Sequence, residues 1–363
     1  MVLVAVIMGA TLTALTNAYR ATETARSTIG LNNNLRIGTD LIVRDLIQVG
    51  QGMPTGRTVQ VPNGAGELLI QRPHPQGSAC TEWPAGTTVI PAVTVGPGCG
   101  PTIGGVATDM VTTLSVDSSL DAVPVWSINA GGHAATVSRP CSNNPPCNPL
   151  LPGEAIGGID ISAGGPDDVR VGDLMMFTKG SGSALVYVTA VDGGQIFTFG
   201  AGDPMNLNQF DAALNGTLDD LATTAPTTAN SSNVSRVRMI TYYLDNTIDA
   251  TTPRLIRHMN WGDPTADLNR RGRTVAFAIE NLQITYDMVD GVNNFSNVRM
   301  VDEDLTTGGR CAPSACSPNQ IRKMNVFIAG RSLEQFSANK RYFRNTLSTQ
   351  VSLRSLALVD RYK

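Results

Sequence analysis

Three histidines are the side chains best suited to acid–base or metal chemistry, and their spacing supports neither. His74, His133 and His258 stand far apart, outside H-E-x-x-H or any paired spacing. The nucleophile elbow G-x-S-x-G is absent, because residues 180–184 read G-S-G-S-A. A glycine-rich nucleotide loop is not supported either, since the glycines at 50–56 follow a helical pattern instead of opening one. A Ser-His-Asp triad stays open because its members are distant in a chain, but we expect no enzyme and no cofactor.

Acidic residues in a glycine-rich segment are the candidates for binding a metal. Carboxylate oxygens in a flexible loop are the ligands that Ca²⁺ prefers, but the D-x-D-x-D-G spacing is missing. We interpret these residues as solvated turn acids and predict no metal, with Ca²⁺ as the alternative. A second acidic cluster, residues 302–304, has the same interpretation. The Ca²⁺ candidates are Asp160, Asp167, Asp168 and Asp173.

Six cysteines form three local couples, each in a loop rich in Gly, Pro, Ser or Asn. The couples are Cys80 with Cys99, Cys141 with Cys147, and Cys311 with Cys316. None has the C-x-x-C spacing of a zinc or redox motif. We interpret them as disulfides, with free thiols or metal ligation as alternatives, and pairing between neighbours is the simplest connectivity. Disulfides indicate an oxidising compartment outside the cytoplasm.

Composition favours a β-rich protein with an uneven charge distribution. The 363 residues include 36 Gly and 21 Pro with only 5% aromatics, which indicates many turns and short strands. Residues 1–50 carry four bases against three acids, residues 51–235 five against fifteen, and residues 236–363 eighteen against twelve. The acidic middle and basic end could pair within one head or between copies. The basic end contains no long run of like charge, so we expect no nucleic-acid partner.

The elements that would position these residues begin with an apolar N-terminal segment. No charge precedes Arg20, and apolar side chains occupy every face, which marks lipid or complete burial by neighbours. A cleaved signal peptide would need a basic residue before the run, and a full membrane span about 20 apolar residues. A buried core helix is the plainer alternative. The residues expected to contact lipid or neighbouring helices are Val2, Leu3, Val4, Val6, Ile7, Met8, Leu12 and Leu15.

The helical pattern continues to about Val49 as an amphipathic stripe, which we expect to pack on a head. The packing residues are Leu31, Leu35, Ile42, Leu46 and Val49. The other face carries charged residues, among them Arg26, Arg36 and Arg44, which would register the helix against acidic partners. Gly30, the asparagines at 32–34 and Gly38 are poor helix formers, so we predict a bend or a melted turn there.

Downstream, strand-like stretches recur between turns. The first group is 67–71, 87–95, 109–116, 123–128, 169–177, 184–191 and 195–199, and the second is 236–244, 254–258, 274–288, 320–330 and 347–358. We predict that the second group forms one sheet that packs on the helix, and that the first elaborates it. The low-complexity stretch 223–233 coincides with the charge switch. The predicted division is therefore a helix at 1–50, a β-rich elaboration at 51–235 and a C-terminal sheet at 236–363.

Several segments resemble the type IV pilin and pseudopilin superfamily, most closely its PilW-type minor pilins. They are MVLVAVIMGATLTALTNAYR at the start, NNLRIGTDLIVRDLIQVG at 33–50, RMITYYL at 238–244 with RLIR at 254–257, and NTLSTQVSLR at 345–354. The resemblance implies an α+β fold, with a long N-terminal α-helix packed on an antiparallel β-sheet head and here a large β-rich elaboration.

The resemblance also implies a function and a location. It implies a structural subunit of a type IV pilus-like filament, acting in pilus assembly or priming. Its partners would be other pilin or minor pilin subunits, the assembly platform and, before assembly, the bacterial inner membrane, with the filament later extracellular. The alternatives are a J-type pseudopilin of type II secretion, a shaft or adhesive pilin, and a membrane-tethered binding ectodomain.

The family's prepilin cleavage motif is missing from the start of the chain. Aligned on residues 7–9, the motif would end immediately before Met1. We expect a truncated start, with loss of processing as the alternative. The family acid that helps to register a new subunit would then be absent.

Overall fold

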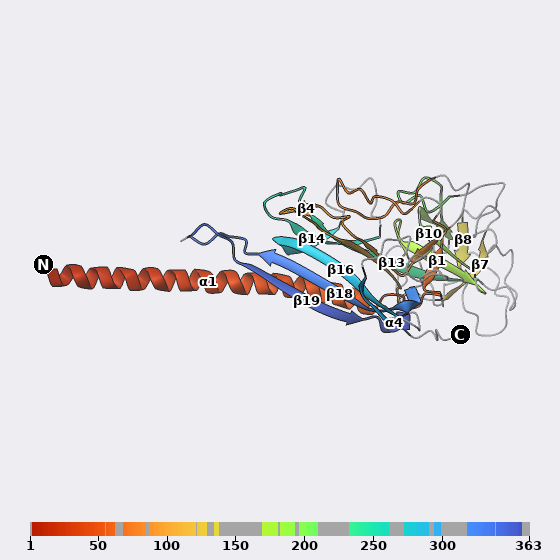
Figure 1. Ribbon diagram of the computed structural model, residues 1–363. Helices are drawn as coiled ribbons and strands as arrows, with labels where there is room; N and C mark the ends of the chain where they lie inside the picture. Colours follow the sequence, from red (N-terminus) through yellow and green to blue (C-terminus); the bar gives the residue numbers. More distant parts are fainter. Residues whose placement is uncertain are drawn as a thin grey trace.

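The computed structural model shows a mixed α+β protein with one long N-terminal helix and many antiparallel strands, which confirms the expected α+β class (Figure 1). The structure describes residues 2–54, 56–61, 68–84, 87–120, 122–128, 134–137, 169–180, 182–192, 196–209, 232–260, 272–289, 294–298, 318–337 and 339–357.

Helix α1 (Val2–Ile47) has 46 residues and is therefore about 69 Å long. Figure 1 shows its N-terminal half outside the head and its C-terminal half packed along the strands. We call residues 2–22 the projecting segment and residues 23–47 the packed segment. The helix ends at Ile47, and the turn that follows it reaches Gly50. Gly50 has a φ of 72°, which glycine adopts without strain, and its N–H donates to the Leu114 carbonyl at 2.8 Å.

The prediction of a melted turn near Gly30 and Gly38 is wrong, because α1 is helical without interruption across both glycines. Packing on the head outweighs their low helix propensity. A Cβ built on Gly38 would lie 2.9 Å from Leu255 Cδ2 and 3.4 Å from Ala276 Cβ. Glycine at this position therefore lets the helix approach the sheet closely.

Eleven strands form the large sheet, and every pairing in it is antiparallel. Its main strand order is β10-β9-β13-β7-β8-β12-β11. In addition, β6 and β14 pair with β13, β3 pairs with β6, and β15 pairs with β14. The strands are β3 (Val93–Gly96), β6 (Met110–Val116), β7 (Val123–Ile128), β8 (Ala134–Val137), β9 (Leu174–Lys179), β10 (Gly182–Tyr187), β11 (Ala190–Asp192), β12 (Ile196–Thr198), β13 (Ser232–Asp245), β14 (Arg254–Met259) and β15 (Arg273–Phe277).

Strand β13 is 14 residues long and belongs to both ends of this sheet. Its first half pairs with β9 and β7, and its second half pairs with β6 and β14. The division predicted after residue 235 falls inside β13, so the same strand serves the regions on either side of it.

A second sheet has four antiparallel strands in the order β17-β16-β18-β19. They are β16 (Ile279–Val289), β17 (Asn294–Val298), β18 (Ile321–Arg331) and β19 (Arg344–Ser352). The prediction that the C-terminal strands form a single sheet is thus wrong, because β13, β14 and β15 belong to the large sheet. The chain changes sheets at Ala278, a residue with φ of 53° between β15 and β16.

Two small sheets and two short helices complete the described elements. They are β1 (Thr58–Gln60) with β2 (Val89–Pro91), β4 (Thr102–Ile103) with β5 (Val106–Ala107), η3 (Pro318–Gln320) and α4 (Arg354–Ala357).

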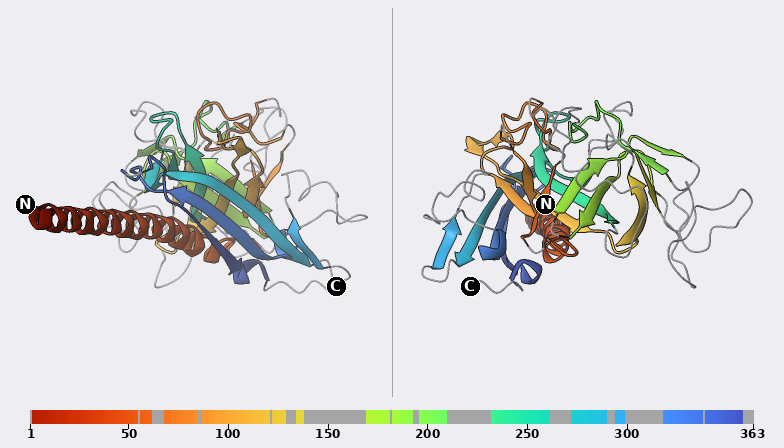
Figure 2. Two further views of the ribbon diagram at one scale, coloured as in Figure 1. Left: turned by 60° about the vertical axis from the view of Figure 1, so that its left-hand side comes forward. Right: turned by 90° about the vertical axis from the view of Figure 1, so that its right-hand side faces the viewer.

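The largest hydrophobic core lies where α1 meets strands of both sheets. It joins helix side chains to residues of β3, β6, β13, β14 and β15 and of β16, β18 and β19. Figure 2 shows the helix nearly end-on, with the blue strands of the four-stranded sheet on one side and the green strands of the large sheet on the other. A second core fills the end of the large sheet formed by β7, β8, β9, β10 and β12, where Phe177 and Phe199 meet edge to face at 5.3 Å.

Candidate functional site: the projecting helix

The projecting segment exposes apolar side chains on every face. Leu3, Met8 and Tyr19 are 75%, 68% and 69% exposed. Successive helical residues are about 100° apart, so the two turns from Leu3 to Ala10, which contain no polar residue, leave no polar side. The expected contact residues Leu3, Val4, Val6, Ile7, Met8, Leu12 and Leu15 are all exposed, and the side chain of Val2 lies outside the described residues.

Threonines interrupt this apolar surface without leaving hydroxyl protons unsatisfied. Thr11 donates to the Ile7 carbonyl at 3.0 Å, and Thr13 and Thr16 each donate to the carbonyl four residues earlier at 2.8 Å. A hydroxyl bonded to its own helix is tolerated in apolar surroundings. The projecting segment can therefore be buried among apolar neighbours despite these residues.

The apolar part of α1 is short. Its first charged residue is Arg20, and Asn17 lies one turn before it. Within the described residues, no helix has the combination of length and hydropathy that a membrane crossing requires.

Glu23 marks the point where the helix first meets the head. Its carboxylate accepts hydrogen bonds from the Ser337 N–H at 2.9 Å and the Ser337 hydroxyl at 2.7 Å. These bonds hold the pKa of Glu23 below its ordinary value. Farther along, Asn345 donates to the side-chain oxygen of Asn32 at 2.7 Å. The turn after β18 and the start of β19 thus determine where the free part of the helix begins.

The packed segment buries its apolar stripe in the main core. The five residues that the sequence pattern selected are at most 2% exposed: Leu31, Leu35, Ile42, Leu46 and Val49. The opposite face is open, with Arg26, Arg36 and Arg44 exposed beside the exposed isoleucines Ile29 and Ile37. The basic face that we expected to register the helix against partners is accessible.

A buried carboxylate fixes the last turn of α1 to the large sheet. Asp45 is 4% exposed, and its Oδ2 accepts from the Tyr242 hydroxyl at 2.5 Å and from Arg257 Nε at 2.6 Å. Burial and the Asp45 charge raise the pKa of Tyr242. Burial alone would lower the pKa of Arg257, but its hydrogen bond and ion pair with Asp45 raise it above the ordinary value.

Sequence reasoning missed this network because its members are far apart in the chain. The signal that could have revealed it is local. Asp45 lies between Ile42 and Leu46 on the face that the apolar stripe buries, and a charged residue there needs a buried partner.

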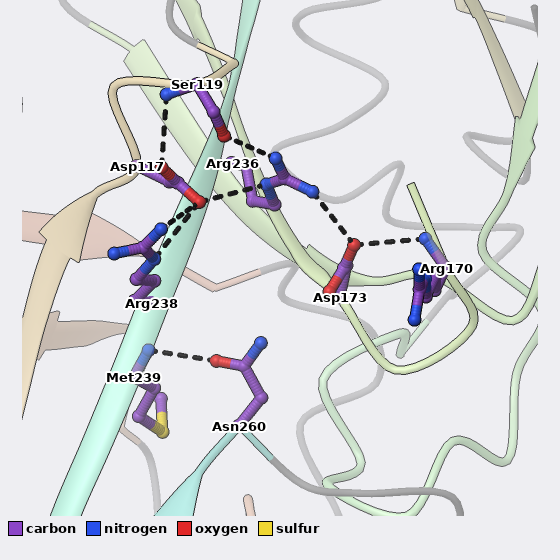
Figure 3. A network of polar contacts seen from close by, with 8 residues as sticks. All are labelled: Asp117, Ser119, Arg170, Asp173, Arg236, Arg238, Met239 and Asn260. Carbon is purple, nitrogen blue, oxygen red and sulfur yellow. Dashed lines mark hydrogen bonds and ion pairs between the residues drawn. The ribbon is translucent and has the colours of Figure 1, made fainter. Parts of the chain in front are cut away.

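A second polar network lies on β13, beside the segments that follow β6 and precede β9 (Figure 3). Asp117, after β6, accepts from Arg238 Nη2 at 2.6 Å and pairs with Arg236 Nε at 3.3 Å. Arg236 also pairs with Asp173, before β9, at 3.6 Å. Although burial acts to raise the pKa of Asp117, hydrogen bonds from Ser119 and Arg238 bring it below the ordinary value. The two arginines of β13 are thus paired with carboxylates from the segments after β6 and before β9.

The Ca²⁺ candidates gain no support among the described residues. Asp173 is engaged by Arg236 and accepts from the Arg170 N–H at 3.0 Å. Within the described part of the chain, no group of three or more metal-binding side chains is found. Asp160, Asp167 and Asp168 lie outside the described residues.

One of the expected disulfides is present, between Cys80 and Cys99. Cys141, Cys147, Cys311 and Cys316 lie outside the described residues, as does His133. His258 is buried beside Tyr243, with its Nδ1 at 3.4 Å from the Tyr243 hydroxyl. His74 Nδ1 lies 2.7 Å from the Arg72 carbonyl oxygen. His74 and His258, the two described histidines, therefore have different partners.

Comparison of the chain with protein-family models, with curated proteins and with solved structures gave no match.

Proposed function

We propose that the protein is a structural subunit of a type IV pilus-like filament, a PilW-like minor pilin acting in assembly or priming. The observation that carries the proposal is the projecting segment, which leaves apolar side chains exposed on all its faces. Such a surface is stable only when other molecules cover it. The resemblance of this segment to pilin helices supplies the identity of those molecules.

The energetics favour several neighbours around one helix. The seven exposed residues between Leu3 and Leu15 would each contribute about 1.5–3 kcal/mol on full burial, or about 10–20 kcal/mol together. Association costs about 4–15 kcal/mol. A single partner could cover only one face and would recover a fraction of the gain. Contacts on all faces, as in a helical bundle, make the gain exceed the cost.

The resemblance adds the steps before assembly. The subunit would wait in the bacterial inner membrane, with its head in the periplasm, and pass through an assembly platform into an extracellular filament. Removal from lipid costs little when the same surface is reburied against helices, so packing and polar pairing select the partners. The exposed arginines of the packed segment would provide that pairing. The J-type pseudopilin and the adhesive pilin remain variants of the same plan.

The proposal is tested by changing the projecting segment in the native cells. We expect Ile7→Asp to remove the chain from sheared filaments, because a carboxylate would be buried among apolar helices. Ile248→Asp is the matched control, since Ile248 is a 68% exposed isoleucine on a turn of the head. Immunoblots compare the filament and membrane fractions at equal expression. Equal recovery of both variants in filaments, or a wild-type chain found only in membranes, would refute the proposal, and the second result would favour a tethered ectodomain.

A further inference from the structure

The Cys80–Cys99 disulfide lies against a buried arginine. Arg72 is 2% exposed, and its Nη2 is 3.6 Å from Cys99 Sγ. Its Nε donates to the Cys80 carbonyl at 3.2 Å. One guanidinium therefore contacts both residues of the disulfide.

The surroundings hold the guanidinium in this position. The Trp83 ring lies 5.2 Å from Arg72 Cζ, a cation–π distance. A Cβ built on Gly96 would lie 2.6 Å from Cys99 Sγ and 3.0 Å from Arg72 Nη2. The absence of a side chain at Gly96 is what allows the arginine and the sulfur to meet.

The two sulfurs differ in access and in electrostatics. Cys99 is 4% exposed and carries the arginine contact on its sulfur, whereas Cys80 is partly exposed. An adjacent guanidinium lowers the pKa of a thiol. The thiol with the lower pKa is the better leaving group in disulfide exchange. Attack from outside is thus directed to Cys80, with Cys99 departing.

We propose that this disulfide is a thiol–disulfide exchange site that accepts an external thiolate at Cys80. The incoming sulfur forms a bond with Cys80 Sγ while the Cys80–Cys99 bond breaks. The bonding electron pair stays on Cys99, which becomes a thiolate next to Arg72. No oxidant is consumed, and the product is a mixed disulfide that Cys99 can resolve by the reverse step. The ligand class is any accessible thiolate, from a small thiol or from a cysteine of another chain.

The site is tested on the folded full-length chain with millimolar glutathione as the probe. After acid quenching, peptide mass spectrometry locates the added glutathione. We expect it on Cys80, with Cys99 free to react with an alkylating reagent. Glutathione on Cys99, an equal distribution, or no mixed disulfide in the folded chain would overturn the proposal.

Variants of Arg72 test the role of the guanidinium. Because Cys99 would lose the positive charge beside its departing sulfur, Arg72→Met should slow the exchange several-fold. Arg72→Lys should restore part of the rate, and Lys179→Met, which removes a charge from β9, should leave it unchanged. An unchanged rate in a folded Arg72→Met chain would refute the electrostatic role. Should that variant fail to fold, the position of glutathione in the wild-type chain still decides whether the site exists.

Discussion

The Asp45 carboxylate should be one of the strongest single contributions to the attachment of α1. Replacing one partner of a buried ion pair costs about 3–5 kcal/mol because the other charge is left uncompensated. The Arg257 side chain is 22% exposed, so water would compensate it in part and place the cost of Asp45→Ala near 3 kcal/mol. With a urea dependence of about 3 kcal/mol/M, the unfolding midpoint should fall by about 1 M.

Asp40→Ala is the matched control for this experiment. Asp40 is exposed on the same helix, and both substitutions gain the same helix propensity of about 0.5 kcal/mol. The difference between the two variants therefore isolates the buried network. Circular dichroism of the full-length chain during a urea titration gives both midpoints.

A double-mutant cycle of Asp45→Ala with Tyr242→Phe checks the hydrogen bond at 2.5 Å between the two side chains. Directly contacting residues couple by about 0.5–3 kcal/mol, and we expect a coupling of more than about 1 kcal/mol here. Equal midpoints for Asp45→Ala and Asp40→Ala, or the absence of coupling to Tyr242, would refute the assigned role of Asp45.

Three further results are expected. Gly38→Val should destabilise the chain by about 1–3 kcal/mol through overpacking. Gly30→Ala should stabilise it by up to about 1 kcal/mol, because nothing lies within 4 Å of a Cβ built there. Urea midpoints in the opposite order would contradict the close approach of the helix to the sheet at Gly38. The pKa of Asp117 is lowered in the folded chain. Its contribution to the free energy of unfolding is therefore present above the unfolded pKa of about 3.9 and is lost as pH falls through the folded pKa. The difference in urea midpoint between wild type and Asp117→Asn should shrink on acidification below pH of about 4, and a constant difference would show that the charge is not involved. Glu23→Ala should accelerate hydrogen exchange at the Ser337 amide, which donates to Glu23, and an unchanged exchange rate would mean that another group protects that amide.

The sequence predicted the packing of α1 correctly because a helix buries a stripe at fixed spacing. The five residues of the predicted stripe all belong to the main core: Leu31, Leu35, Ile42, Leu46 and Val49. The melted turn predicted between Gly30 and Gly38 was wrong, because single-sequence propensity cannot reveal that Leu255 and Ala276 need the space beside Gly38.

The arrangement of the strands could not be predicted to the same extent. Alternating residues identified most strands, but pairing is decided by partners far away in the chain. Residues after 235 were assigned to one sheet, whereas Ala278 redirects the chain from one sheet to the other. The Asp45 network illustrates the same limit, since Tyr242 and Arg257 are separated from Asp45 by 197 and 212 residues.

The length of strand β13 has a mechanical consequence for any load applied to helix α1. A pull on α1 would reach β13 directly through the Asp45–Tyr242 bond, and β13 continues into the second core, where it pairs with β9 and β7. Its ladder bonds lie across the strand direction and would be strained together in shear. A load on the helix would therefore be carried along β13 to every core that the strand enters.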